Sequence, residues 1–171
     1  MLVLATLLSH APRAQTAETL LLREPALSRD RLAFSYAGDI WTANRDGTNP
    51  QRLTVGPGVE TNPHFSPDGQ WIAYTGDYDR NADVYVVAVG GGPPRRLTWH
   101  PSADIVRDWT PDGQRILFSS SQEAYARSLQ LFTVAVAGGL PTRLPLLMGE
   151  KGSYAPDGQR LAHTHITNPT T

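Results

Sequence analysis

Residues 66–74 read Ser66-Pro67-Asp68-Gly69-Gln70-Trp71-Ile72-Ala73-Tyr74. Variants of this phrase recur at residues 28–34, 110–118 and 155–163. Measured at one small or aliphatic position in each copy, the steps are 40, 44 and 45 residues, from Ala33, Ala73, Leu117 and Ala162. A period of about 40 to 45 residues is typical of the four-stranded blades of a β-propeller. The repeat therefore predicts a propeller of antiparallel sheets.

The Pro-Asp-Gly core of the phrase predicts a tight turn between two strands. Proline fixes φ at the second turn position, aspartate is tolerated at the third, and glycine accepts the left-handed conformation that ends the turn. The turn leads into segments rich in aromatic and β-branched side chains, such as 71–75 and 115–119. These segments are expected to be strands.

The other expected strands of each blade fall into three sets. The strands that follow in the chain lie at 39–43, 83–89 and 130–136. Short outer strands, whose arginines and prolines suit a sheet edge, lie at 51–54, 95–98 and 142–145. The innermost strands, beside the central channel, lie at 61–65, 104–109 and 150–154. Residues 83–89 and 130–136 are apolar at nearly every position, so both of their faces must be covered by neighbouring blades.

The repeats predict an all-β chain that forms an incomplete β-propeller, with three four-stranded blades and a partial fourth. The predicted propeller covers residues 18–171, with blades at about 20–55, 60–98, 103–146 and 150–166. Closed propellers have typically four to eight blades. Because the chain stops at Thr171, just past the second strand of its fourth blade, we expect a fragment of a longer protein.

Composition excludes several classes of partner and site. The chain of 171 residues has a formal net charge of -1 and a pI near 6.5, which argues against recognition of nucleic acid through a basic surface. It contains no cysteine, so disulfides and thiolate metal sites are excluded.

Residues 1–17 predict a secretory signal peptide and hence a periplasmic or secreted location. An apolar run at 1–8 is followed by small residues, with cleavage expected between Ala14 and Ala17. The segment lacks the Lys or Arg of an n-region, which leaves two alternatives: translation starts further upstream, or the segment is a buried strand. The apolar run is far shorter than the roughly 20 residues of a membrane-spanning helix, so no membrane span is expected.

No segment carries a recognisable catalytic signature. The sequence lacks a Gly-x-Ser-x-Gly elbow, a phosphate-binding glycine loop ending in Lys-Ser/Thr, and His-Glu-x-x-His. Ser119, Ser120 and Ser121 end a predicted strand without a predictable histidine partner, so polar turn residues are the favoured interpretation. The phrase at 66–71 departs from the sialidase Asp box, Ser-x-Asp-x-Gly-x-x-Trp, by one residue on each side of the glycine. We predict no catalytic residues.

Two patterns invite a metal-binding interpretation, and both are incomplete. His163 and His165 face one side of a predicted strand, but no cysteine or nearby carboxylate completes the tetrahedral set that zinc prefers. Residues 77–83 carry oxygen ligands at alternate positions, but Ala82 replaces the turn glycine of a calcium loop and Ala88 stands at its closing glutamate position. An EF-hand is excluded, and turn capping by Asp and Asn is favoured over an irregular calcium site. No metal or cofactor is predicted.

The four tryptophans, Trp41, Trp71, Trp99 and Trp109, are spread through the repeat. Packing between blades is the favoured interpretation, over a stacking platform for a ligand. Because the aromatic residues are unclustered and the Asp box is missing, a secreted sugar-binding propeller is the least favoured functional hypothesis.

The repeat resembles those of the TolB and tricorn propeller families. The likeness is carried by Pro-Asp-Gly-Gln before an apolar strand, then Asp-Val-Tyr-Val-Val, a glycine turn and Arg-Arg-Leu-Thr. It covers almost everything after residue 20. Three stretches look like the opening of bacterial tricorn protease homologues, at 34–41, 60–69 and 127–134. Those homologues are large serine peptidases of the carboxy-terminal processing type.

The resemblance implies an amino-terminal propeller that precedes a second propeller, a PDZ domain and a catalytic core with a serine nucleophile and a histidine base. No segment of this chain matches that core, so no catalytic residue is carried over. The implied role is non-catalytic: the propeller filters peptides or channels them to or from a distant active site. The expected partners are peptides or unfolded protein segments in the central channel, and the rest of the chain's own polypeptide.

The innermost strands of a propeller line its central channel, so their charged side chains are the first candidates for contact with a passing peptide. These candidates are Glu60, His64, Asp104, Arg107, Glu150 and Lys151. The alternative is that these polar side chains only hold blades together.

A scaffold like TolB is the second functional hypothesis. In such a protein a periplasmic propeller docks partner proteins and catalyses nothing. TolB carries a separate α/β domain ahead of its propeller, whereas the predicted blades here begin at about residue 20, which favours the tricorn hypothesis.

Overall fold

The computed structural model describes residues 21–123 and 128–164. All regular elements in these residues are β-strands, which form three four-stranded antiparallel sheets and one two-stranded sheet. The prediction of an all-β, incomplete propeller with three four-stranded blades and a partial fourth is confirmed. The predicted signal peptide at 1–17 and the candidate ligand His165 lie outside the described residues.

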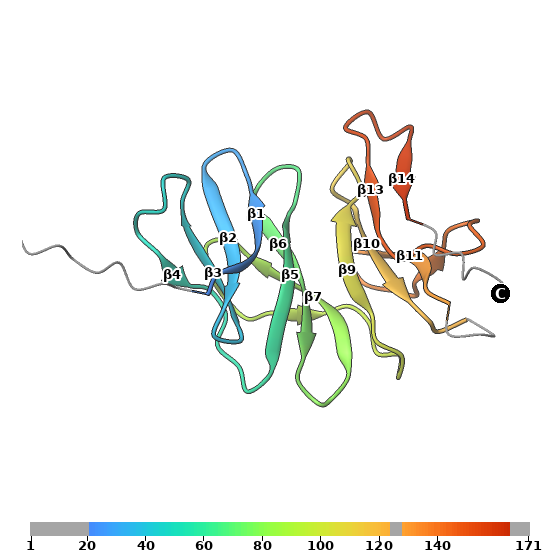
Figure 1. Cartoon of the computed structure of the whole chain (residues 1–171), viewed down its shortest axis with the longest axis horizontal. Coiled ribbons are helices and arrows are strands. Elements are labelled where there is room, and N and C mark those ends of the chain that lie inside the picture. Colours follow the sequence, from blue (N-terminus) through green and yellow to red (C-terminus); the bar gives the residue numbers. More distant parts are fainter. Residues whose placement is uncertain (1–20, 124–127, 165–171) are drawn as a thin grey trace, which may run out of the picture.

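Each sheet consists of strands that are consecutive in the chain, and Figure 1 shows the sheets following one another in chain order. The first blade contains β1 (Arg23–Leu27), β2 (Arg31–Tyr36), β3 (Asp39–Asn44) and β4 (Gln51–Arg52). The second contains β5 (Val59–Phe65), β6 (Trp71–Asp77), β7 (Ala82–Ala88) and β8 (Arg95–Arg96). The third contains β9 (Ile105–Trp109), β10 (Arg115–Ser120), β11 (Gln130–Ala135) and β12 (Thr142–Arg143). The partial fourth contains β13 (Gly152–Tyr154) and β14 (Leu161–His163).

The first strand of each blade occupies one edge of its sheet, and these edge strands are neighbours in space. β1 contacts β5, β5 contacts β9, and β9 contacts β13. Propeller blades are arranged around an axis in this way, with their first strands closest to it. β1, β5, β9 and β13 are therefore the inner strands, and the face that they share is called the inner face below.

The outer strands β4, β8 and β12 have two residues each, fewer than the four-residue segments expected from the sequence. One further backbone hydrogen bond extends each ladder, in which the amide of Leu53, Leu97 or Leu144 donates to the third strand of its own blade. The chain then leaves the sheet to reach the next inner strand, and this departure ends the pairing.

The Pro-Asp-Gly turns form as the sequence predicts. The glycines of the three copies have φ values of 70°, 68° and 70°, at Gly69, Gly113 and Gly158. In the second blade the Gly69 amide donates to the Ser66 carbonyl at 2.8 Å, and the Asp68 carboxylate accepts from the Gln70 amide at 3.0 Å. Positive φ is strained for residues with a Cβ, so glycine is required at this position.

The central strand β7 is covered on both faces, as its apolar sequence predicts. Val84 and Val86 belong to a buried cluster that includes β9, β10 and β11 of the third blade. Val87, which points to the opposite face, packs with Ala33 and Ile40 of the first blade. Strand β7 is therefore sandwiched between two neighbouring sheets, which explains why its side chains do not alternate between apolar and polar.

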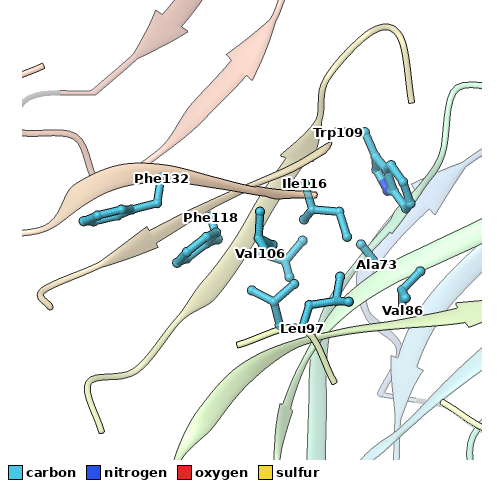
Figure 2. Packing of buried hydrophobic residues seen from close by; sticks show 10 residues of the cluster. Ala73, Val86, Leu97, Val106, Trp109, Ile116, Phe118 and Phe132 are labelled. Carbon is cyan, nitrogen blue, oxygen red and sulfur yellow. The ribbon is translucent and has the colours of Figure 1, made fainter. Parts of the chain in front are cut away.

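The larger apolar cluster lies between the second and third blades. Figure 2 shows its side chains, from both blades, including Ala73, Val86, Leu97, Val106, Trp109, Ile116, Phe118 and Phe132. The rings of Phe118 and Phe132 are stacked, with centroids 5.6 Å apart. We call this boundary the second seam, and the boundary between the first and second blades the first seam.

Candidate functional site

Glu60 of β5 lies in the first seam and not on the inner face, which corrects the prediction that it contacts a channel peptide. Its side chain is buried, with 2% of the residue exposed. The carboxylate accepts hydrogen bonds from the Ile40 amide at 3.2 Å, from the Thr54 hydroxyl and from the Tyr78 hydroxyl. Since Ile40 and Thr54 belong to the first blade, Glu60 holds two blades together.

Asp104 occupies the corresponding position in the second seam, immediately before β9, and is likewise wrongly predicted to contact a peptide. It is completely buried, and its backbone amide donates to the Ala82 carbonyl at 2.7 Å. Among the described residues, neither carboxylate oxygen has a hydrogen-bond partner. Burial raises the pKa of Asp104, and the nearby hydroxyls of Ser120 and Thr98 act in the opposite direction.

His64 lies on the inner face, as expected. It lines a cavity of about 380 Å³ together with Glu24, Asn62 and Asp108. Burial lowers the pKa of His64, the carboxylates of Asp108 and Glu24 oppose this shift, and Arg107 reinforces it. The imidazole is therefore neutral at pH 7.

Arg107, Glu150 and Lys151 also lie on or beside the inner strands β9 and β13. The Arg107 guanidinium donates to the Ser119 hydroxyl at 3.0 Å and is partly buried. Burial lowers the pKa of Arg107, and the charge of Glu150 raises it. Lys151 is exposed. These three side chains together with His64 are the predicted candidates that stay available to a ligand on the inner face.

Two carboxylates of the inner strands were not among the candidates predicted from the sequence. Glu24 of β1 accepts from the Asn62 amide of β5 at 2.7 Å. Asp108 of β9 accepts from the Ser153 hydroxyl and the Tyr154 amide of β13, at 2.8 and 3.0 Å. Each carboxylate thus joins one inner strand to the next. No spacing in the sequence indicates this role, because each partner belongs to the following blade.

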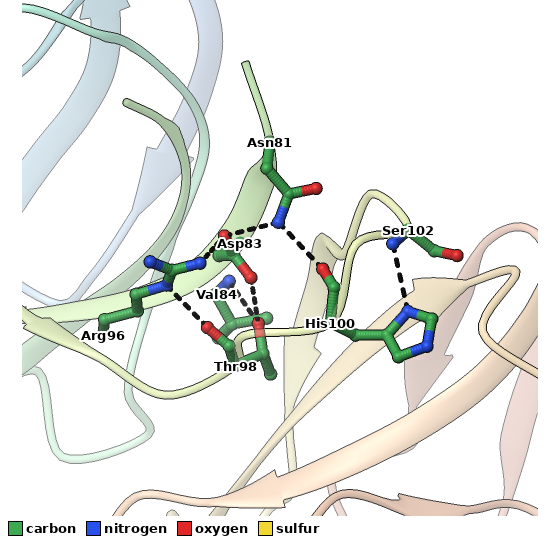
Figure 3. A network of polar contacts seen from close by, with 7 residues as sticks. All are labelled: Asn81, Asp83, Val84, Arg96, Thr98, His100 and Ser102. Atoms are coloured by element: carbon green, nitrogen blue, oxygen red, sulfur yellow. Dashed lines mark hydrogen bonds and ion pairs between the residues drawn. The ribbon is translucent and has the colours of Figure 1, made fainter. Parts of the chain in front are cut away.

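A polar network closes the outer part of the second blade (Figure 3). The buried Asp83 pairs with the Arg96 guanidinium at 2.6 Å and accepts from the Thr98 hydroxyl at 3.2 Å. The Asn81 side-chain amide donates hydrogen bonds to the Asp83 carboxylate at 2.9 Å and to the His100 carbonyl at 2.8 Å. In the segment 77–83 that resembles a calcium loop, Asp83 and Asn81 therefore serve a structural network.

The serine run is not a turn, which corrects the sequence interpretation. Ser119 and Ser120 are fully buried in β10, and the Ser119 hydroxyl accepts from Arg107. The Ser120 hydroxyl accepts from the Gln122 amide at 3.2 Å.

The tryptophans also differ from the prediction. Trp109 is buried, and Trp41 packs edge-on against Tyr36 with ring centroids 5.7 Å apart. Trp71 and Trp99 are exposed, because they stand at the start of β6 and just after β8, where the sheets end. Only two of the four therefore fit the expectation of packing inside the propeller.

Comparison with known proteins identifies the family. Residues 19–171 match the family described as the tricorn protease N-terminal beta propeller domain. The chain belongs to this family. The matched range includes every strand of the described residues.

Other proteins resemble the chain in fold or in sequence. The crystal structure of the tricorn protease superposes with a TM-score of 0.71 and 23% identity, over 80% of this chain and 14% of that chain. TolB from Acinetobacter baumannii gives a TM-score of 0.72 at 20% identity, over 88% of this chain and 39% of that chain. In sequence, the Tol-Pal system protein TolB of Desulfosudis oleivorans is 38% identical over 66 residues, or 36% of this chain and 15% of the relative. The tricorn-type propeller therefore spans only a minor part of each of these three proteins.

Among residues 21–123 and 128–164, no group of three or more His, Cys, Asp or Glu side chains is placed to hold a metal ion. No helix in the same residues is long and apolar enough to cross a membrane.

Proposed function

We propose that this chain is a non-catalytic amino-terminal propeller of a tricorn-like serine peptidase, and that it filters peptides or channels them to a catalytic core elsewhere in the protein. The observation that carries the proposal is the family match over residues 19–171. The parent protein is, on this proposal, a peptidase of the carboxy-terminal processing type.

The inner face suits an extended peptide. It presents charges of both signs: the carboxylates Glu24 and Asp108 line the same cavity as His64, and the cations Arg107 and Lys151 lie on β9 and just before β13. Charges of both signs at partly exposed positions bind a chain of varied sequence weakly, which is what passage through a channel requires. Peptide contact is therefore expected on β5, β9 and β13.

Photo-crosslinking tests this proposal. An extended peptide that carries benzoylphenylalanine is incubated with the chain, irradiated, and its attachment points are mapped by mass spectrometry. We expect attachment on the inner strands, and weaker binding after paired Arg107→Ala and Lys151→Ala substitutions. Arg95→Ala, which removes an exposed cation from the outer strand β8, is the matched control. Attachment only to the outer strands, or equal binding by the paired variant and the control, contradicts the proposal.

The second candidate function is a TolB-like scaffold that docks folded partner proteins. It is favoured by the similarity to TolB proteins in sequence and in fold. On this proposal a folded partner attaches at the loops and outer strands, and extended peptides compete poorly for it. The same crosslinking measurement, made with a folded partner and with an extended peptide, separates the two functions.

A periplasmic or secreted location remains part of the proposal. It rests on the apolar run at 1–8 and the small residues that follow it. Expression in a Gram-negative host followed by fractionation and amino-terminal sequencing tests it. Cleavage between Ala14 and Ala17 is the expected outcome, and an uncleaved chain retained in the cytoplasm contradicts it.

A further inference from the structure

The first and second seams each carry a buried acid at the same place in the repeat. Glu60 and Asp104 occupy equivalent positions, and the amide of each donates to a carbonyl of the preceding blade, at Gly38 and Ala82. The two repeats differ at a second equivalent position, which is Tyr78 in the first seam and Gln122 in the second. The two seams therefore provide a comparison within one molecule.

In the first seam the tyrosine fills the space beside the acid. A Cβ added at Gly56 or Gly58 would lie 2.8 or 2.7 Å from the ring of Tyr78, so the ring packs directly on the glycine backbone. The Tyr78 hydroxyl donates to Glu60 and lies 3.0 Å from the Tyr74 hydroxyl. Burial and the Glu60 carboxylate raise the pKa of Tyr78, which keeps this hydroxyl protonated.

In the second seam the equivalent space is open. A cavity of about 470 Å³ is lined by Thr98, His100, Asp104 and Gln122, which correspond to Thr54, Gly56, Glu60 and Tyr78 of the first seam. This volume lies within the range of small-molecule sites. Figure 3 shows Thr98 and His100 in the connection that follows β8. No described side chain supplies Asp104 with the donor that Tyr78 supplies to Glu60.

The walls of this cavity are largely apolar and reach the surface. Leu97 forms its inner wall, and Trp99, Leu140 and Pro141 form its outer part. Trp99 is 62% exposed and Leu140 is 91% exposed. Large apolar side chains around a concave site whose buried Asp104 carboxylate lacks a donor favour a ligand with an apolar body and a hydrogen-bond donor.

We propose that the second-seam cavity binds a tyrosine side chain of a partner polypeptide, whose hydroxyl donates to Asp104 as Tyr78 donates to Glu60. The aromatic ring contacts the walls formed by Trp99 and Leu140, and the hydroxyl supplies the missing partner of a buried carboxylate. A buried acceptor left without a donor costs free energy, so a ligand that brings a donor gains affinity. This site lies between two blades and goes beyond the proposed channelling on the inner face.

Binding is measured by NMR, from the indole signals of the ¹⁵N-labelled chain, with three probes. N-acetyl-tyrosinamide is the expected ligand, and the Trp99 signal is expected to shift on binding. N-acetyl-phenylalaninamide lacks only the hydroxyl, and its affinity should be about tenfold lower, as the loss of one buried hydrogen bond to a charged group predicts. N-acetyl-lysinamide tests whether charge alone attracts a ligand to Asp104. Equal binding of the tyrosine and phenylalanine probes, or tighter binding of the lysine probe, overturns the proposal.

Three variants locate the site. Asp104→Asn should reduce the preference for tyrosine over phenylalanine, because the asparagine carbonyl accepts a weaker, uncharged hydrogen bond, whereas the exposed Asp79→Asn, with the same change of charge, should keep it. Leu140→Gln alters an exposed wall and leaves the fold intact, so it should weaken both aromatic probes. Unchanged preference in Asp104→Asn, or unchanged affinity in Leu140→Gln, overturns the assignment.

A graft of the first seam into the second is the sharpest test. The triple variant His100→Gly, Ser102→Gly and Gln122→Tyr reproduces Gly56, Gly58 and Tyr78. It should fill the cavity, raise the melting temperature and abolish binding of N-acetyl-tyrosinamide. Retained binding by a folded triple variant overturns the proposal.

The source of the tyrosine is tested separately. A blocked Gly-Tyr-Gly peptide should bind at least as tightly as p-cresol, because the partner is a polypeptide. Binding of p-cresol without binding of the peptide overturns a polypeptide partner. Tyr125→Phe removes the hydroxyl of a tyrosine of the chain itself. A several-fold rise in the affinity of this variant for N-acetyl-tyrosinamide would mean that the chain's own tyrosine competes for the cavity, and would overturn a tyrosine from a partner polypeptide.

Discussion

The indole Nε1 of Trp109 donates a hydrogen bond of 2.9 Å to the backbone carbonyl of His64. Trp109 stands at the end of β9 and His64 near the end of β5, so one side chain links the inner strands of two successive blades. The same indole is 3% exposed and belongs to the apolar cluster of the second seam. Blade order is thus stabilised by a contact that combines burial with one directed bond.

Trp109→Phe should destabilise the chain by about 1–3 kcal/mol, because it removes this bond and leaves unfilled volume in the seam. Urea unfolding followed by circular dichroism measures the change. Trp99→Phe, at an exposed position, is the matched control and should change stability by about 0.5 kcal/mol or less. Equal effects of the two substitutions would contradict a role for the buried indole.

Gly113→Ala should cost about 1 kcal/mol, because Gly113 has a φ of 68° and an L-residue is strained in that conformation. Gly90→Ala is the control: the position has no positive φ, and nothing lies within 4 Å of an added Cβ. That control should be neutral or slightly stabilising, since alanine reduces the entropy of the unfolded chain. Thermal denaturation measures the stability of both variants. An unchanged melting temperature in Gly113→Ala would argue against strain in the turn.

Arg96→Ala should cost about 2 kcal/mol, because it leaves the buried Asp83 carboxylate without its cation. Arg52→Ala removes the same contact in the first blade, where Arg52 is more exposed and its partner Asp39 is less deeply buried. We therefore expect about 1 kcal/mol or less there. Guanidinium unfolding curves measure the loss of stability in the two variants. A larger loss in Arg52→Ala than in Arg96→Ala would contradict burial as the cause.

Asp104→Asn should raise stability at pH 7 by about 1–2 kcal/mol, because the buried carboxylate has no partner among the described residues. Burial raises the pKa of Asp104 above its ordinary 3.8. The folded state then binds the proton more tightly than the unfolded state, so stability falls as pH rises from that ordinary value through the folded pKa. Of the charged groups that face it, Asp83 strengthens this effect and His100 weakens it.

The measurement for Asp104 is the free energy of unfolding at a series of pH values. The difference between Asp104→Asn and the unaltered chain should grow with rising pH and then level off. Asp79→Asn, at an exposed position, should leave the pH profile of the unaltered chain in place. A constant difference at all pH values would show that Asp104 has the same pKa in the folded and unfolded states.

The His64 imidazole should titrate below its ordinary pKa of 6.5 in NMR spectra, because burial lowers its pKa. A folded-state pKa below the unfolded one means that the unfolded state binds the proton first, so stability falls as pH drops below 6.5. His64→Gln should remove this part of the acid sensitivity. A titration midpoint at or above 6.5 would show that burial is not the dominant influence on the pKa of His64, because the carboxylates of Asp108 and Glu24 act to raise it.

Much of the fold could be predicted because its signals are local. The turn phrase at 66–71 indicates its own geometry through proline and glycine, and strand β7 indicates by its nearly continuous apolar sequence that both of its faces are buried. The period of the repeat then orders the blades. Each of these signals is carried by residues that are close together in the chain.

The candidate site was harder to predict because β-bulges interrupt the alternation of side chains. The pairing of β5 with β6 shifts register between Thr61 and His64, and Asn62 has a φ of 53°. Glu60, before this bulge, is buried in the first seam, whereas His64, after it, lines a cavity on the inner face. A regular alternation would have given both side chains the same environment, and the sequence does not mark the bulge.

By itself the sequence determined the number of strands, their order, the turns between them and the membership of each blade, because covalent spacing and local conformational preference control these features. Tertiary structure alone decided which inner-strand acid enters a seam and what it meets there. Glu60 accepts a hydrogen bond from the Tyr78 hydroxyl, whereas Asp104, at the same position of the repeat, lines a cavity. That difference arises because the partner of each acid comes from segments that only folding brings together.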